Sequence, residues 1–292
     1  AQDWQWMKHI GGLGRDFNKV SASDEVGNVY VVGVFEGACL FGSDPIQEGD
    51  AYIAKLDPAG ALIWLKTCSS PTNGLGFADL IVDSVSQSLY VVGSYEGSCI
   101  LDTVTLYSGN FAGALLARWT YEGSCLWAKN IATSSTDLFG SRCYGRSLAM
   151  MPDGQIIVSG TTTEYAQTFV QGVLYDYGAF ISAYDANGTS LWARQYLTQN
   201  FSVNAFQVTL ISHGPRVYAG VSYGLNSQAD SMVVDTTVLV GGPIQGYLLS
   251  RIDPFDGSSI WMKHEGIGGT FAIAQQPMAF DQTGRLAVVG LL

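Results

Sequence analysis

The sequence has few charged residues and almost no signal for α-helix. Of its 292 residues only 13% are charged, whereas 47% are hydrophobic and 35 are glycines. This balance is typical of many short β-strands joined by tight turns. No apolar run approaches the roughly 20 residues of a membrane-spanning helix. We therefore expect no transmembrane segment, and because the sequence starts with Ala1-Gln2-Asp3, we expect that a signal peptide, if one existed, has been removed.

Basic residues are scarce and do not cluster. The 14 lysines and arginines stand against 25 acidic residues, giving a formal net charge of −11. Because binding to phosphate needs a basic footprint, nucleic acid is disfavoured as a partner. A net negative charge at low charge density fits an extracellular protein, although many cytosolic proteins share it.

Cysteine is also limited, with five residues and no Cys-x-x-Cys pair. This spacing disfavours a zinc site. Cys39 and Cys99 follow matching Glu-Gly-x sequences and so occupy the same position of a repeat. We predict that all five cysteines are unpaired and buried. A single disulfide is the alternative, and the sequence cannot assign it.

Familiar catalytic motifs are missing as well. There is no Gly-x-Ser-x-Gly, His-Glu-x-x-His, P-loop or paired-carboxylate pattern. An enzyme is therefore disfavoured without being excluded, and no catalytic residue or metal ligand is predicted.

What the sequence does contain is a repeat marked by tryptophan. Five tryptophans follow one another at intervals of 58, 63, 65 and 69 residues: Trp6, Trp64, Trp127, Trp192 and Trp261. In the four complete repeats a polar turn such as Asp57-Pro58-Ala59-Gly60 precedes the tryptophan-bearing strand. A period of this size in a strand-rich chain predicts a propeller or an array.

The first repeat shows the predicted unit. Strands are expected at 17–22, 29–35, 51–56 and 62–67, with an irregular segment through Cys39 and Phe41 to Gly49 between the second and third. Four antiparallel strands in about 60 residues make one propeller blade. The tryptophans are predicted to be core residues at the interfaces between blades.

The second strand of each repeat is apolar on both faces, which predicts an inner strand covered on both sides. Each carries one glycine, expected to let backbones approach or the strand bend. These glycines are Gly33, Gly93, Gly160, Gly220 and Gly290.

We therefore predict one all-β domain over residues 1–292, a β-propeller of four-stranded antiparallel blades. Four complete blades end near Trp64, Trp127, Trp192 and Trp261. An N-terminal strand at 4–10 is expected to close the last blade. The fifth blade lacks a third strand, so either it closes with three strands or the chain continues beyond residue 292; we favour continuation.

Two segments carry a family resemblance. Asp24-x-x-Gly27-Asn28-Val29-Tyr30-Val31-Val32-Gly33, together with Asp50-Ala51-Tyr52-Ile53-Ala54-Lys55-Leu56-Asp57-x-x-Gly60 and Trp64, resembles the SBBP-type (seven-bladed) β-propeller repeat. It weakens in later repeats, where Asp50 becomes Gly113, Gly178 and Gly246. The resemblance implies a secreted or cell-surface bacterial protein, as in Bacteroidetes, where such propellers are cargo of type nine secretion. It implies no catalytic residues.

The turn and tryptophan strand also resemble the repeat of quinoprotein dehydrogenases, which would bring a quinone cofactor and calcium. That repeat is shorter, nearer 40 residues, so a redox enzyme is the weaker interpretation.

The candidate binding residues follow the second strands. Acids and aromatics at one propeller mouth would bind sugar by stacking or calcium by carboxylates. Alternatively, they are strand-end residues that face solvent or pack on loops, which we favour. They are Glu36, Glu96, Glu164, Phe35, Tyr95 and Tyr223.

The function expected from these observations is a non-enzymatic, adhesion-like binding or scaffold module for protein or glycan. No cofactor is expected apart from the calcium alternative. A carbohydrate-active enzyme, a quinone-dependent dehydrogenase and a structural filament or coat component stay open.

Overall fold

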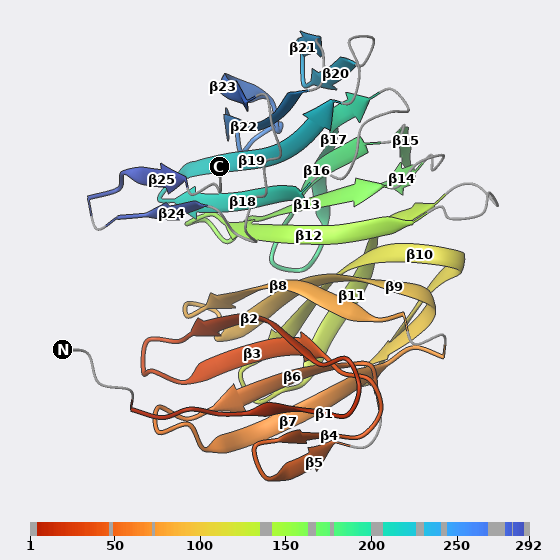
Figure 1. Cartoon of the computed structure of the whole chain (residues 1–292), viewed down its shortest axis with the longest axis vertical. Coiled ribbons are helices and arrows are strands. Elements are labelled where there is room, and N and C mark those ends of the chain that lie inside the picture. The colour runs from red at the N-terminus through yellow and green to blue at the C-terminus, as the bar shows by residue number, and fades with distance from the viewer. Residues whose placement is uncertain are drawn as a thin grey trace. The chain divides into compact units, whose positions relative to one another are not determined.

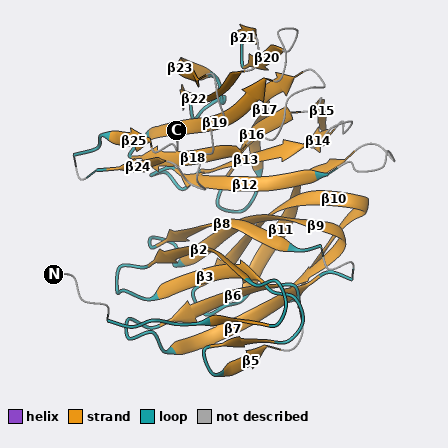
Figure 2. Ribbon diagram, viewed as in Figure 1, coloured by secondary structure: helices purple, strands orange, loops and turns teal. Residues whose placement is uncertain are grey.

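The structure is a computed structural model in which every regular element of the described residues is a β-strand (Figures 1 and 2). It divides into two compact units, Ala1–Thr133 and Ser134–Leu292, which are described separately. The described residues are 5–46, 49–71, 74–134, 142–162, 168–175, 178–199, 207–225, 231–240, 244–267, 278–281 and 283–288. Among them, no helix is long and apolar enough to cross a bilayer. The predicted all-β class with antiparallel sheets is confirmed.

The first unit contains two repeats of four strands, each paired antiparallel in chain order. The first repeat is β2 (Phe17–Ser23), β3 (Val29–Val34), β6 (Ala51–Leu56) and β7 (Leu62–Ser69). The second is β8 (Gly76–Asp83), β9 (Ser88–Leu101), β10 (Val104–Thr120) and β11 (Cys125–Ser134).

The second unit repeats this plan twice and begins it a third time. The third repeat is β12 (Cys143–Met150), β13 (Ile156–Thr162), β16 (Gly178–Tyr184) and β17 (Ser190–Gln199). The fourth is β18 (Gln207–His213), β19 (Arg216–Leu225), β22 (Ile244–Ile252) and β23 (Ser259–Ile267). The pair β24 (Met278–Phe280) and β25 (Leu286–Val288) begins the fifth.

The segment expected to be irregular is a short hairpin inserted between the second and third strands. In the first repeat it is β4 (Cys39–Phe41) with β5 (Asp44–Ile46). In the second it is formed by the end of β9 and the start of β10. The others are β14 (Thr168–Val170) with β15 (Val173–Tyr175), and β20 (Ser231–Val234) with β21 (Thr237–Val240).

These inserted hairpins pair with the fourth strand of the preceding repeat. In the first unit, β9 pairs with the end of β7 at Leu101↔Cys68, and β4 pairs with β1 (Ile10–Gly12), which follows Trp6. In the second unit, β20 pairs with the end of β17 at Val234↔Leu197. Within each unit, these hairpins therefore connect neighbouring repeats through backbone hydrogen bonds.

Tryptophan indoles make a second link between neighbouring repeats. The indole N–H of Trp6 donates to the Pro58 carbonyl at 3.0 Å, and that of Trp64 donates to the Tyr121 carbonyl at 2.9 Å. In the second unit, Trp192 donates to Pro254 at 2.8 Å. Each acceptor lies in the turn before the next tryptophan strand. These tryptophans are half-buried side chains at interfaces between repeats, rather than fully buried core residues.

Each such turn ends in a glycine packed against the indole. Gly60, Gly123 and Gly257 have φ between 76° and 84°, a conformation that favours glycine. A Cβ on Gly257 would lie 2.5 Å from the Trp192 ring. Glycine therefore suits this position for two reasons: it adopts positive φ, and it has no Cβ that would collide with the indole ring.

The second strands of the four complete repeats are largely buried as predicted, whereas the described residues of β25 are half-buried or exposed. The glycines of the second strands have two roles. A Cβ at Gly93 would lie 2.3 Å from the carbonyl oxygen of Gly76, so the predicted close approach of backbones is confirmed. At Gly33, Gly160 and Gly220 a third-strand aromatic ring also crosses the glycine: Tyr52, Phe180 and Tyr247, respectively. Gly290 lies outside the described residues.

None of the five cysteines forms a disulfide, and all five are buried, as predicted. Burial raises the pKa of the Cys99 and Cys125 thiols to about 12. At neutral pH both thiols are protonated and therefore poor nucleophiles.

Candidate functional site

The aromatic residues predicted to bind sugar lie in the core. Phe35, Tyr95 and Tyr223 are only 4%, 0% and 6% exposed. The Phe35 ring lies 6.4 Å from that of Tyr52, and the Tyr95 hydroxyl donates to the side-chain oxygen of Asn130. A sugar stacks on an exposed ring face, which this packing does not offer. These three rings therefore pack in the core, and their faces are not available to stack on a sugar.

The predicted acids lie closer to solvent. Glu36, just after β3, is exposed, and its backbone N–H donates to the Asp16 carboxylate at 3.2 Å. The Asp16 carboxylate also accepts a hydrogen bond from the Gly12 backbone N–H. A loop carboxylate therefore holds the end of β3 beside Glu36.

Glu96 lies within β9 and is half-buried. Its backbone carbonyl accepts a hydrogen bond from the Ser70 hydroxyl at 3.0 Å. The Ser70 N–H donates to the carboxylate of Asp50, whose pKa is raised by desolvation on burial. Glu164 lies outside the described residues.

Two pairs of acidic residues lie near the ends of strands in the first unit, Asp16 with Glu36 and Asp50 with Glu96, and we call these four residues the acidic rim. Within the described ranges, no group of three or more His, Cys, Asp or Glu side chains is placed to hold a metal ion. Calcium binding at Glu36 and Glu96 stays an untested alternative.

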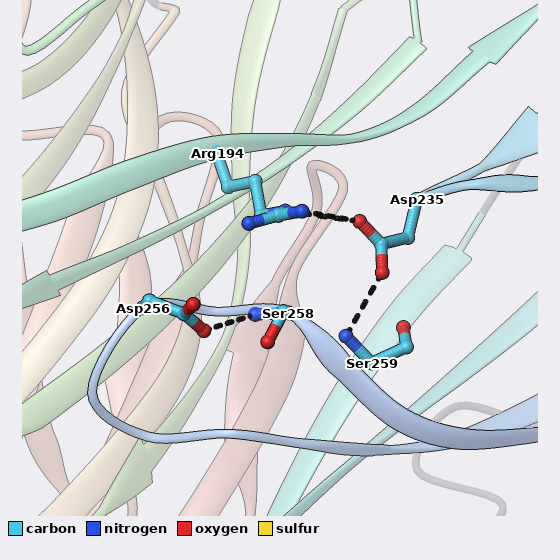
Figure 3. Close-up of polar contacts among 5 residues, drawn as sticks. All are labelled: Arg194, Asp235, Asp256, Ser258 and Ser259. Carbon is cyan, nitrogen blue, oxygen red and sulfur yellow. Dashed lines mark hydrogen bonds and ion pairs between the residues drawn. The ribbon is translucent and has the colours of Figure 1, made fainter.

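A second polar cluster, which the sequence did not predict, surrounds Asp235 (Figure 3). Asp235 forms the turn between β20 and β21 with φ of 52°. One carboxylate oxygen pairs with the Arg194 guanidinium at 2.6 Å, and the other accepts from the Ser259 N–H at 3.0 Å. One carboxylate therefore joins the fourth strand of the third repeat, the inserted hairpin and the fourth strand of its own repeat.

The same arrangement recurs in part at Asp102, in the hairpin of the second repeat. Asp102 also has positive φ, 55°, and its carboxylate accepts from the Cys125 N–H at 3.2 Å. Cys125 and Ser259 each stand two residues before a repeat tryptophan. The sequence signal that could have found both is Asp-Thr directly after an apolar residue, at 102–103 and 235–236.

The outer strands carry a repeated exposed apolar residue. In all four complete repeats the pairing of the third and fourth strands slips at the residue just before the tryptophan, forming a β-bulge. The bulge residue is always aliphatic and about half exposed. These four residues, the bulge aliphatics, are Ile63 (51%), Leu126 (51%), Leu191 (51%) and Ile260 (48%).

The inserted hairpins add exposed apolar side chains near the outer strands. Leu40 and Ile100 occupy the same position in β4 and β9 and are 46% and 47% exposed. Phe169 in β14 is 42% exposed. Large exposed apolar residues scattered singly need no explanation, whereas the bulge aliphatics recur at one repeat position.

No family model matches the chain, and no curated protein matches it. Similar solved structures include a Bacteroides ovatus ATCC 8483 protein to which hydrolase activity is ascribed, at 10% identity and TM-score 0.37, with 87% of this chain and 70% of that chain covered. Two others are a puromycin-hydrolyzing peptidase of Mycobacterium tuberculosis (12%, TM-score 0.35, 83% and 36% covered) and the quinohemoprotein alcohol dehydrogenase of Comamonas testosteroni (13%, TM-score 0.36, 96% and 48% covered). Likeness at this level transfers no activity to this chain.

Proposed function

We propose that the four-stranded repeats are blades of a β-propeller, and that the protein is a non-enzymatic binding scaffold whose outer strands contact a protein partner. Three features support the propeller arrangement: the antiparallel order of strands within each repeat, the buried second strands, and the indole links between neighbours. A fold of this kind is a rigid support that leaves specificity to its surface residues.

The observation that carries the binding role is the set of bulge aliphatics. Half-exposed Ile or Leu occurs at this one position in all four complete repeats. A β-bulge interrupts the regular edge, so the strand resists pairing with another strand while its side chain stays accessible. Exposed aliphatic residues favour a protein partner over a glycan, because they offer burial of apolar area but no hydrogen bonds.

The acidic rim suits a different kind of ligand from the bulge aliphatics, namely a glycan or Ca²⁺. Its carboxylates accept hydrogen bonds from sugar hydroxyls and are oxygen ligands suited to Ca²⁺. Binding of a glycan or Ca²⁺ by wild type, with loss in a Glu36→Gln, Glu96→Gln variant, would place recognition there instead of at the outer strands.

Photo-crosslinking tests the protein-binding role. A photoreactive phenylalanine analogue replaces Ile63, Leu126, Leu191 or Ile260 one at a time, and the purified protein is irradiated in an extract of the cells that produce it. Val85, in the turn after β8 and 97% exposed, is the matched control for an exposed apolar position outside the outer strands. We expect one partner to be crosslinked from several bulge positions and not from position 85. Equal crosslinking at all positions would overturn the proposal.

The proposal also places the protein outside the cell or on a bacterial surface, as the resemblance to secreted propeller repeats implies. The check is cell fractionation with an antibody against the purified protein. Recovery from the medium or the outer surface is expected, whereas recovery in the cytoplasmic fraction alone would contradict this location.

A further inference from the structure

The first strands of three repeats contain a β-bulge opposite the second-strand glycine. At each bulge, one residue of the first strand has no partner in the register with the second strand. These first-strand bulge residues are Lys19 in β2, Ala78 in β8 and Arg146 in β12. In the fourth repeat, β18 pairs with β19 without a slip. A bulge redirects the side chain of the extra residue, and bulges are frequent beside binding sites.

The second-strand glycine makes room for the bulge. A Cβ on Gly160 would lie 2.7 Å from the carbonyl oxygen of Tyr144, and a Cβ on Gly33 would lie 2.5 Å from that of Phe17. Each carbonyl belongs to the residue two positions before the bulge. Because the glycine has no Cβ, the first strand can approach closely and bend there.

Two of the three first-strand bulges carry a cation that lies over an aromatic ring. The guanidinium carbon of Arg146 lies 4.7 Å from the centroid of the Tyr144 ring, and the Lys19 ammonium lies 5.1 Å from that of Phe17. In both, the ring belongs to the residue two positions before the bulge. The same pair of residue types in two repeats indicates that the bulge holds a cation in a fixed direction.

Arg146 is held at one end of its guanidinium and free at the other. Its Nε donates to the buried hydroxyl of Thr161 at 2.8 Å. Among the described residues, none accepts a hydrogen bond from its two terminal nitrogens, and none offers it a carboxylate. Desolvation on burial lowers the pKa of the Arg146 guanidinium, although the interaction with Tyr144 opposes this shift.

A desolvated cation without a counter-ion is costly to a fold. Arg194 shows how the cost is offset elsewhere in the second unit, because its guanidinium pairs with the Asp235 carboxylate at 2.6 Å. At Arg146 the stacked ring fixes the plane of the guanidinium and Thr161 uses Nε. The two terminal nitrogens are then a planar pair of donors, which matches the two oxygens of a carboxylate.

We propose that Arg146, stacked on Tyr144, binds a small ligand through a carboxylate group. The two carboxylate oxygens accept hydrogen bonds from the two terminal nitrogens of Arg146, while Thr161 and Tyr144 keep the guanidinium in place. None of the bulge aliphatics belongs to this site. The proposal therefore goes beyond the protein-binding role of the outer strands and does not depend on it.

Acetate is the probe for a test, and acetamide, which has a similar shape without the charge, is its neutral counterpart. The full-length protein is labelled with ¹⁵N-arginine and titrated with each compound to about 100 mM at constant ionic strength. The Nε–H signal of Arg146 is assigned from its loss in Arg146→Lys. Inorganic phosphate is titrated in the same way, as an anion of tetrahedral shape.

We expect a saturable shift of the Arg146 Nε–H signal with acetate, with Kd below about 20 mM, and none with acetamide. Phosphate should bind more weakly than acetate. Arg194, whose guanidinium is already paired with Asp235, is the internal control and should not shift.

Thermal unfolding extends the test to variants that lack the arginine signal. Acetate at about 100 mM should raise the Tm of wild type by about 2 °C, by binding to the folded state. This rise should be absent in Arg146→Met. Arg142→Met is the matched control, because Arg142 is an exposed arginine directly before β12, and this variant should keep the rise.

The same variant separates a ligand site from a structural contact. Without added acetate, the Tm of Arg146→Met should lie within about 3 °C of wild type or above it, because the variant removes a desolvated cation that has no counter-ion. A larger fall would show that the guanidinium serves the fold through an internal partner, and would overturn the proposal.

Three further results would overturn it. The first is an absence of saturation by acetate, and the second is an equal response to acetamide, since the charge would then not be recognised. The third is tighter binding of phosphate than of acetate, which would show that the site does not select the planar carboxylate.

Discussion

The guanidinium of Arg194 and the carboxylate of Asp235 form an ion pair at 2.6 Å that joins β17 of the third repeat to the hairpin inserted in the fourth. The Asp235 side chain is 7% exposed and that of Arg194 is 33% exposed. Water thus screens one side of the pair only. The second carboxylate oxygen is used by the Ser259 N–H, so the removal of Asp235 breaks two contacts at once.

Replacement of Asp235 by glycine should lower the free energy of unfolding by about 1–3 kcal/mol. Glycine is chosen because Asp235 has positive φ, so that this variant removes the carboxylate without straining the backbone. Asp235→Asn keeps an acceptor oxygen and should lose less. Urea denaturation measures both, and an Asp235→Gly protein as stable as wild type would show that the pair contributes nothing.

Trp64→Phe should destabilise the protein by about 0.5–1.5 kcal/mol through loss of the N–H bond to Tyr121. Part of any effect will come from the smaller ring. Thermal unfolding followed by circular dichroism measures the loss, and a Trp64→Phe protein as stable as wild type would count against the indole link.

Tyr52→Phe should leave stability unchanged or raise it by about 1 kcal/mol. The Tyr52 hydroxyl is buried, and no described residue offers it a hydrogen bond, so its removal relieves a desolvation cost. Tyr95→Phe is the matched variant: Tyr95 is equally buried, but its hydroxyl donates to Asn130, and its loss should destabilise by about 1 kcal/mol. Denaturant midpoints that rank the two variants in the opposite order would contradict these assignments.

Acid should weaken the turn at Asp24. Burial alone would raise the pKa of this carboxyl, but hydrogen bonds from Asn28, Tyr30 and Val26 outweigh it and hold the pKa below the ordinary value of 3.8. A lowered folded pKa stabilises the fold above the unfolded pKa, and this stability is lost as pH falls from about 3.8 through the folded pKa.

The difference in unfolding free energy between wild type and Asp24→Asn should therefore be larger at pH 6 than at pH 3. Glu25→Gln, which removes one negative charge from the exposed neighbouring residue, is the control for a change of charge at this turn. A difference in unfolding free energy that is constant with pH would show that the negative charge of Asp24 does not contribute to stability.

Local patterns predicted the strands and turns well. The second strands, such as Val29–Val34, are apolar on both faces and lie buried between partners, as their sequence indicates. The turns with Asp and Gly also fall where expected, because their chemistry is local. Burial of the cysteines follows from the same strand pattern.

Contacts between repeats were harder to predict. The hairpin at Cys39–Ile46 has strands of three residues, too short for a periodic signal, and its partner β1 lies far away in sequence. Asp235 looks like an ordinary turn residue until Arg194 is placed beside it. Phe35, Tyr95 and Tyr223 were considered either as exposed sugar-binding rings or as strand-end residues that face solvent or pack on loops, yet they lie in the core among residues from other strands.

Each sequence repeat makes some of its contacts with the next repeat, through its tryptophan and its fourth strand. This determines where the chain can be cut into fragments that fold. A cut between two repeats, for instance just after Ser69, would separate Trp64 from the Tyr121 carbonyl and β7 from its partner in β9. A fragment designed on sequence repeats would thus expose an indole and a strand edge at its boundary. The smallest autonomous fragment should instead begin with a fourth strand and end after the third strand and turn that follow it.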